Sequence, residues 1–69
     1  MNQNSLRARA KSLQKWGLPL SVLAKMIGIS PSMTTRWTAG EKNLGEENYD
    51  KMVMAVEGME GLLEFENKK

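Results

Sequence analysis

The 69-residue chain contains no cysteine and no histidine. Without cysteine there are no disulfides and no thiolate metal sites, and without histidine the usual general base is missing. We therefore expect no metal, no cofactor and no catalytic residue. Ser21 and Lys25 have the spacing of a Ser–Lys nucleophile pair on a helix, but this spacing arises often by chance. We expect a protein that is not an enzyme.

Long apolar runs are also missing, since no segment approaches the roughly 20 apolar residues that cross a bilayer. The sequence shows no signal peptide pattern, and the lack of cysteine fits a reducing compartment. We expect a cytoplasmic protein with no membrane partner.

Acidic residues are absent from the first 40 residues, which carry six Lys or Arg. All eight acidic residues lie in residues 41–69, together with four lysines. A long segment with positive charge alone indicates an anionic partner. The alternative is that the two parts neutralise each other within the folded domain.

The length of the chain predicts one small domain, residues 1–69, with frayed ends at 1–4 and 66–69. Because disulfides and metals are excluded, oligomerisation is the remaining support for so small a core. The length leaves no room for a separate sensor domain, so we expect no small-molecule ligand.

Helical periodicity runs through the chain, and no strand-like alternation persists. A first helix is expected from a cap at Asn4 or Ser5 to about Trp16, with Gly17 ending it. Three residues share its apolar face: Leu6, Ala10 and Leu13. The basic residues are expected on its other faces.

Turn and cap signals divide the next segment into two helices. Pro19 suits the first turn of a second helix, and Gly28 ends that helix with a positive φ. Ser30 caps a third helix that begins at Pro31 and stops before Gly40. The second helix carries an apolar stripe: Leu20, Leu23, Ala24 and Ile27.

The last segment predicts a fourth helix that starts at Glu46 and Glu47, whose charges suit a helix N-terminus. Four apolar residues follow at helical spacing: Tyr49, Met52, Val53 and Val56. Gly58 and Gly61 then weaken the pattern, so residues 59–65 are expected as a short fifth helix or an extended arm. The fold class is a compact all-α domain of four to five helices.

The connection between the second and third helices is very short. Gly28 gives the turn its backbone shape, Ala24 lets the two helices approach, and Ile29 fills the gap beneath the turn. Two short helices joined this tightly cross at a large angle. These features specify a helix-turn-helix, whose second helix fits the major groove of DNA.

The segment LSVLAKMIGISPSMTTRWTAG resembles the helix-turn-helix of phage repressors and Cro proteins, the XRE-type family. The resemblance covers about residues 18–57. It implies a lambda repressor-like fold, a bacterial cytoplasm, and a Cro-like repressor that binds a palindromic double-stranded DNA operator as a dimer. The matching elements are Leu23-Ala24, Gly28-Ile29-Ser30, Arg36-Trp37 and Gly40.

The chain departs from the family pattern at four positions. Pro19 and Leu20 stand where members often have a Thr or Ser cap and a glutamine. Thr34 stands where an aliphatic residue usually packs inward, and we expect Met33 to fill that role. Thr38 stands where many members have glutamate.

Residues 30–39 are the expected recognition helix. Its exposed side chains are short, which permits close approach to base edges, and Arg36 can bond guanine O6 and N7. The alternative is that Arg36 meets phosphate or solvent. Trp37 is expected in the core. The candidate base contacts are Pro31, Ser32, Thr35 and Arg36. The candidate phosphate contacts are Ser30, Lys25, Lys42 and Asn43.

We expect a homodimer that forms through the apolar residues after Val56. The dimer can be one that forms only on DNA. The candidate contacts are Met59, Leu62, Leu63 and Phe65. The alternative is that Leu62 and Phe65 fold back and complete a monomeric core.

Two rival functions remain open. One is a protein-interaction module of the antitoxin or anti-repressor kind, and the other is a transcription activator on the same fold. The sequence does not distinguish them.

Overall fold

The computed structural model describes the backbone of residues 2–67 and the side chains of residues 2–63. In this range the chain is all-α and has no strand. The elements are α1 (Gln3–Ser12), a 3₁₀ helix η1 (Leu13–Trp16), α2 (Leu20–Ile27), α3 (Pro31–Thr38) and α4 (Glu46–Asn67). The expected all-α class is confirmed.

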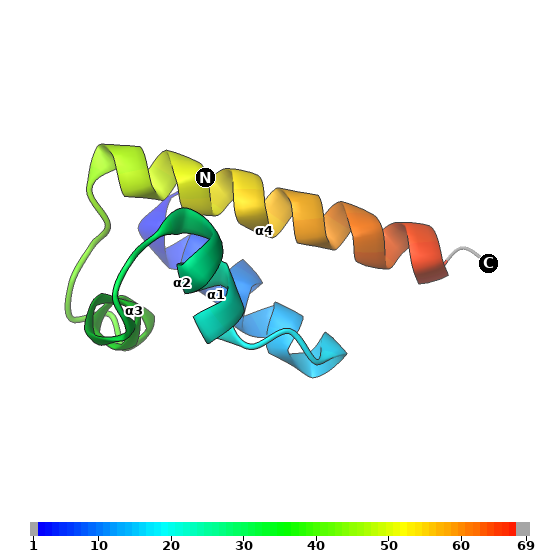
Figure 1. The fold of residues 1–69 in the computed structure, drawn as a ribbon, viewed down its shortest axis with the longest axis horizontal. Helices are drawn as coiled ribbons and strands as arrows, with labels where there is room; N and C mark the ends of the chain where they lie inside the picture. The colour runs from blue at the N-terminus through cyan, green and yellow to red at the C-terminus, as the bar shows by residue number, and fades with distance from the viewer. Residues whose placement is uncertain (1, 68–69) are drawn as a thin grey trace.

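The long helix α4 organises the molecule, which measures 38 × 20 × 19 Å. It packs on α2, α1 and η1, while α3 packs on α2 and α1. Figure 1 shows α3 at one end of the long axis, and the C-terminal half of α4 (orange to red) running to the opposite end. The third helix is therefore far from the C-terminal end of the domain.

The core forms where the apolar stripes of the helices meet. The stripes expected on the first two helices are buried, and from α4 Met52 and Val56 are fully buried. Tyr49 and Val53 are half-buried against them. The buried apolar residues are Leu6, Ala10, Leu13, Leu20, Leu23, Ala24, Ile27, Trp37, Leu44, Met52 and Val56.

The start of α1 differs from the prediction of a cap at Asn4 or Ser5. The N-cap is Asn2, whose backbone is extended and whose Oδ1 accepts a hydrogen bond of 2.8 Å from Ser5 N. Gln3 is held by bonds to the main chain of Leu44. Asn2, Gln3 and Asn4 therefore do not fray as expected, while Met1 lies outside the described residues.

The prediction that the basic residues avoid the core face of the first helix is wrong for Arg7. Its side chain is buried, at 8 % exposure. The helix α1 ends at Ser12, and η1 carries the chain to Gly17, which has a φ of 85°. The expected glycine stop is therefore confirmed, although the last turn is a 3₁₀ helix.

The connection from α2 to α3 follows the expected chemistry. Gly28 has a φ of 81°, and Ser30 Oγ accepts a hydrogen bond of 3.1 Å from Met33 N. Pro31 is the first residue of α3, and Gly40, with a φ of 81°, follows its C-cap. Pro19 differs by one position, since it is the N-cap of α2 and lies outside the first turn.

The expected fifth helix or extended arm is not found, because α4 continues without a break from Glu46 to Asn67. A glycine inside a helix costs about 1 kcal/mol relative to alanine. Met59 and Leu63 pack against the core on either side of Gly61, and this burial offsets the cost. Residues 66 and 67 lie within α4, whereas 68–69 lie outside the described residues.

Replacing Gly28 and Gly58 by alanine should have opposite effects on stability. A Cβ at either position meets no atom within 4 Å, so only the backbone decides. The positive φ of Gly28 strains any L side chain, and Gly28→Ala should destabilise by about 1 kcal/mol. Gly58→Ala, in the helix α4, should stabilise by roughly 0.5–1 kcal/mol. Urea unfolding followed by circular dichroism measures both, and a stabilising Gly28→Ala would contradict the turn geometry.

Candidate nucleic-acid interface

The outer face of α3 is built from short side chains and one arginine. Thr34 and Trp37 face inward, and Met33 is half-buried against the core, so Thr34 and Met33 share the inward role expected of Met33 alone. The Thr35 hydroxyl donates to Pro31 O at 3.0 Å, which leaves its oxygen as an acceptor toward a partner. Four side chains are exposed: Pro31, Ser32, Thr35 and Arg36.

Trp37 anchors α3 to the rest of the domain. Its side chain is fully buried, and its indole Nε1 donates to Gln3 Oε1 at 2.8 Å. Gln3 Nε2 donates in turn to Leu44 O at 3.1 Å. One glutamine therefore links the start of α1, the end of α3 and the loop before α4. This role of Gln3 could not be predicted from local sequence patterns, because its partners Trp37 and Leu44 are more than 30 residues away.

Arg7 is a second anchor that sequence reasoning missed. Its Nε donates to Trp37 O, and its Nη1 donates to Asn4 Oδ1 at 2.8 Å. Its Nη2 donates to Lys42 O at 2.9 Å and to Asn43 Oδ1 at 2.8 Å. The guanidinium carbon lies 5.7 Å from the centroid of the Trp37 ring, within cation–π range.

All the acceptors of Arg7 among the described residues are neutral, so within this part of the chain its charge is buried without a carboxylate partner. Two of these acceptors belong to Lys42 and Asn43, which are candidate phosphate contacts in the loop after α3. A third, the carbonyl of Trp37, lies in the last turn of α3, where a positive charge is favourable to the helix dipole. Arg7 therefore fixes α3 and the following loop relative to each other.

The four candidate phosphate contacts are all exposed but differ in what they still offer. Lys25 borders the same groove as Pro31 and Thr35, so α2 brings this cation beside the outer face of α3. The Ser30 oxygen caps α3, and its hydroxyl proton remains available to a phosphate. Asn43 uses Oδ1 to accept from Arg7, which leaves its amide NH₂ group as a donor.

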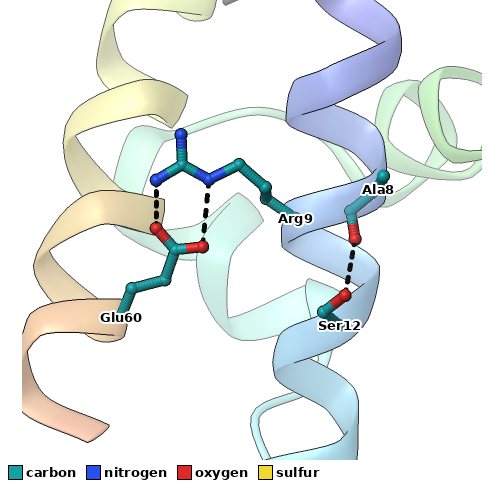
Figure 2. A network of polar contacts seen from close by, with 4 residues as sticks. All are labelled: Ala8, Arg9, Ser12 and Glu60. Carbon is teal, nitrogen blue, oxygen red and sulfur yellow. Dashed lines mark hydrogen bonds and ion pairs between the residues drawn. The ribbon is translucent and has the colours of Figure 1, made fainter. Parts of the chain in front are cut away.

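The exposed cations fall into paired and unpaired groups. Figure 2 shows the Arg9 guanidinium facing the Glu60 carboxylate, with Nε to Oε2 at 3.0 Å and a second bond from Nη2 to Oε1. The hydrogen bonds that Arg9 donates to the Glu60 carboxylate raise the pKa of Arg9 above its ordinary value. Lys51 lies 3.4 Å from Glu47, one turn away on α4. The Arg9–Glu60 pair joins the basic and acidic parts of the chain and so neutralises part of the charge asymmetry within the domain.

The cations around α3 belong to the unpaired group. In the part of the chain that the structure describes, the side chains of Lys25, Arg36 and Lys42 have no ion-pair partner. Three positive charges are therefore left for an anionic partner on the side of the molecule that carries α3.

The expected dimer contacts divide between the surface and the core. Leu62 is 60 % exposed, whereas Met59 and Leu63 are half-buried against the core. The side chain of Phe65 lies outside the described residues. Trp16, which the sequence did not single out, is 57 % exposed and borders a hollow of about 250 Å³ together with Leu62. The exposed apolar surface thus combines α4 with η1.

Among the side chains of residues 2–63, no group of three or more acidic residues is arranged to hold a metal ion. None of the helices within residues 2–67 has both the length and the hydropathy needed to cross a bilayer. Compared with protein-family models, curated proteins and solved structures, this chain matches none. The short exposed side chains of α3 and the unpaired cations near it are therefore the features that indicate a function.

Proposed function

We propose that this protein is a sequence-specific regulator of transcription that binds double-stranded DNA, with α2 and α3 as a helix-turn-helix and α3 as the recognition helix. The observation that carries the proposal is the outer face of α3, where Arg36 has no ion-pair partner among the side chains of residues 2–63 and stands among short exposed side chains. A bulky or acidic face would prevent close approach to bases and phosphates.

The proposed mechanism follows from the groups that α3 presents. Arg36 donates two hydrogen bonds to guanine O6 and N7 in the major groove. Thr35 and Pro31 contact thymine methyl groups, and Ser32 offers a donor and an acceptor to a base edge. Lys25 and the loop after α3 bind phosphates and set the register, while Arg7 and Trp37 hold the helix rigidly behind this face.

A dimer is part of the proposal, because one recognition helix reads too few base pairs to select a site in a genome. Recognition helices in successive major grooves lie about 34–36 Å apart, so each α3 must lie about 17–18 Å from the dyad. This spacing can be reached if the two copies meet at the C-terminal ends of α4 and their α4 helices diverge at an angle toward the DNA. A head-on arrangement in line would separate the α3 helices too widely, since α3 lies at the other end of the 38 Å axis (Figure 1).

Occupation of the operator then excludes polymerase, as in a Cro-like repressor.

Arg36 and Lys25 provide the test of DNA recognition. Arg36→Ala should weaken specific binding by about 1–3 kcal/mol and relax the preference at one base pair in each half-site. Lys25→Ala should instead weaken binding to all sequences about equally and reduce the slope of log affinity against log salt by about 1. Gel-shift titrations of both variants on specific and unrelated duplexes, over a series of KCl concentrations, measure these effects.

Arg9→Ala is the matched control, because Arg9 is paired with Glu60 and should leave specificity unchanged. If Arg36→Ala binds all duplexes as the parent does, α3 is not the recognition helix. If the parent binds no duplex even at low salt, the DNA-binding proposal fails and a protein-interaction module becomes the better account.

Leu62→Glu tests the dimer contact. A charge on this exposed apolar surface should lower affinity for a full palindrome by about tenfold or more, with little change for a single half-site. Met54→Glu is the control, since Met54 is 74 % exposed elsewhere on α4. Sedimentation and gel shifts decide between the outcomes. Equal losses on both DNAs, with monomeric protein before and after the change, would exclude this contact.

A further inference from the structure

A groove of about 690 Å³ lies between α2 and α3, outside the core. It exists because the facing side chains of the two helices are short. Its lining includes Leu20, Ala24, Ile29, Thr34, Thr38 and Ala39. A volume between about 300 and 1,000 Å³ with mostly apolar walls is typical of small-molecule sites.

The threonines of α3 make this groove more apolar than their residue type indicates. The Thr34 hydroxyl donates to Ser30 O at 2.9 Å, and the Thr38 hydroxyl donates to Thr34 O at 2.7 Å. Thr35 makes the same kind of bond to Pro31 O. These bonds use the hydroxyl protons within the helix, so the threonines offer the groove methyl groups and few donors.

Both charged residues that line the groove are lysines. Lys11 comes from α1 and Lys25 from α2, and neither has an ion-pair partner among the side chains that the structure describes, residues 2–63. No acidic residue borders the groove. An apolar floor with two unpaired ammonium groups at its rim is complementary to a molecule with an apolar body and a negative head.

We propose that the groove binds a small amphipathic carboxylate, with its hydrocarbon body between α2 and α3 and its carboxylate paired with Lys11 or Lys25. Three groove residues are also candidate DNA contacts, namely Lys25, Pro31 and Thr35. A bound carboxylate and DNA therefore exclude each other, which makes the carboxylate an inducer that releases the operator. This second step rests on the proposed function, whereas binding of the carboxylate does not.

The site differs from the expectation that so short a chain takes no small-molecule ligand. That expectation assumes that a small-molecule ligand binds to a separate sensor domain. Here the groove belongs to the two helices that meet DNA, so no further domain is needed to couple the two events.

Straight-chain carboxylates are the probes. Octanoate and decanoate, below their micelle concentrations, are titrated into the isotope-labelled protein and followed by NMR, with octanol and octylamine as matched neutral and cationic probes. We expect shifts at Ala24, Thr35 and Ala39, and about tenfold tighter binding of decanoate because two more methylenes are buried. Octylamine should bind at least about tenfold more weakly than octanoate, since its head group is repelled by the lysines.

Two variants test the geometry of the site. Lys11→Glu should weaken decanoate binding by about tenfold, and Ala39→Leu should weaken it by about tenfold or more because the new side chain occupies the groove. Lys15→Glu, which makes the same charge change outside the groove, should have no effect. Circular dichroism verifies the fold of each variant. Equal affinity for octylamine and octanoate, or shifts centred on Trp16 and Leu62, would overturn the site.

A further experiment tests whether carboxylate binding in the groove affects DNA affinity. Decanoate should lower the DNA affinity of the parent protein and leave that of Ala39→Leu nearly unchanged. If decanoate binds in the groove while DNA affinity stays the same, mutual exclusion is wrong. If the parent binds no DNA at all, the proposed function fails, and the carboxylate titration still decides the site on its own.

Discussion

Trp37→Ala should lower the free energy of unfolding by about 3–5 kcal/mol, the largest effect that we expect of a single substitution in this chain. Trp37 is fully buried and is the largest side chain in the core. Its loss leaves a cavity, removes the indole hydrogen bond to Gln3, and takes away the ring over which Arg7 lies. Small domains are stable by only a few kcal/mol, so the variant should be largely unfolded at room temperature.

Trp16→Ala is the matched control, because it removes the same side chain from a site that is 57 % exposed. We expect a loss of about 1 kcal/mol or less, as for other surface substitutions. Thermal and urea unfolding by circular dichroism measure both variants. A stable Trp37→Ala protein that no longer binds DNA would place Trp37 at the interface and contradict its role as an anchor.

Arg7→Met should destabilise the protein by about 2–4 kcal/mol, the second largest effect. The change leaves four acceptors without their donor, among them the carbonyls of Trp37 and Lys42. Part of the cost is regained because a buried charge is removed. Arg7→Lys should rescue little, since a single ammonium group cannot bond acceptors spread over α1, α3 and the following loop.

Arg9→Met separates this effect from the loss of a surface ion pair. Arg9 also lies on α1 and pairs with Glu60, but the pair is partly exposed and screened by solvent, so its loss should lower stability much less than the loss of Arg7. Urea unfolding of the two variants gives the comparison. NMR shifts of residues 41–45 in Arg7→Met should report disorder in the loop, and an unchanged loop would show that Arg7 does not position it.

The local elements of the fold could be predicted because local chemistry decides them. The spacing of Leu20, Leu23 and Ile27 fixes the buried face of α2 whatever packs against it. Ser30 and Pro31 start α3 through a cap and a fixed φ that need no distant partner. Gly28 and Gly40 mark helix ends because a positive φ suits glycine alone.

The prediction of a short fifth helix or extended arm at residues 59–65 is wrong because two local signals, Gly58 and Gly61, are outweighed by tertiary packing. Gly58 and Gly61 lower helix propensity and favoured a break. Met59 and Leu63, however, are half-buried against the core, which includes residues from the start of the chain such as Leu6. Tertiary burial outweighs a propensity difference of about 1 kcal/mol for each glycine, and a sequence pattern does not contain that burial.

The anchors behind the candidate site depended on contacts that sequence spacing cannot show. Arg7 and Trp37 are 30 residues apart, and Arg9 and Glu60 are 51 residues apart. Among the basic residues of α1, Arg7 is buried and anchors α3, whereas Arg9 pairs with Glu60 on α4. Their residue types are alike, so only the arrangement of the helices assigned these roles.

The sequence by itself therefore determined the buried face of α2, the cap and extent of α3 and the short polar outer face of α3, since each of these depends on neighbours within one or two turns. The tertiary structure alone decided which arginine is buried, which of the cations remain unpaired beside α3, and that short side chains on α2 and α3 leave a groove between them. These features arise where segments far apart in the chain come together, and their energies depend on burial and distance rather than on order along the sequence.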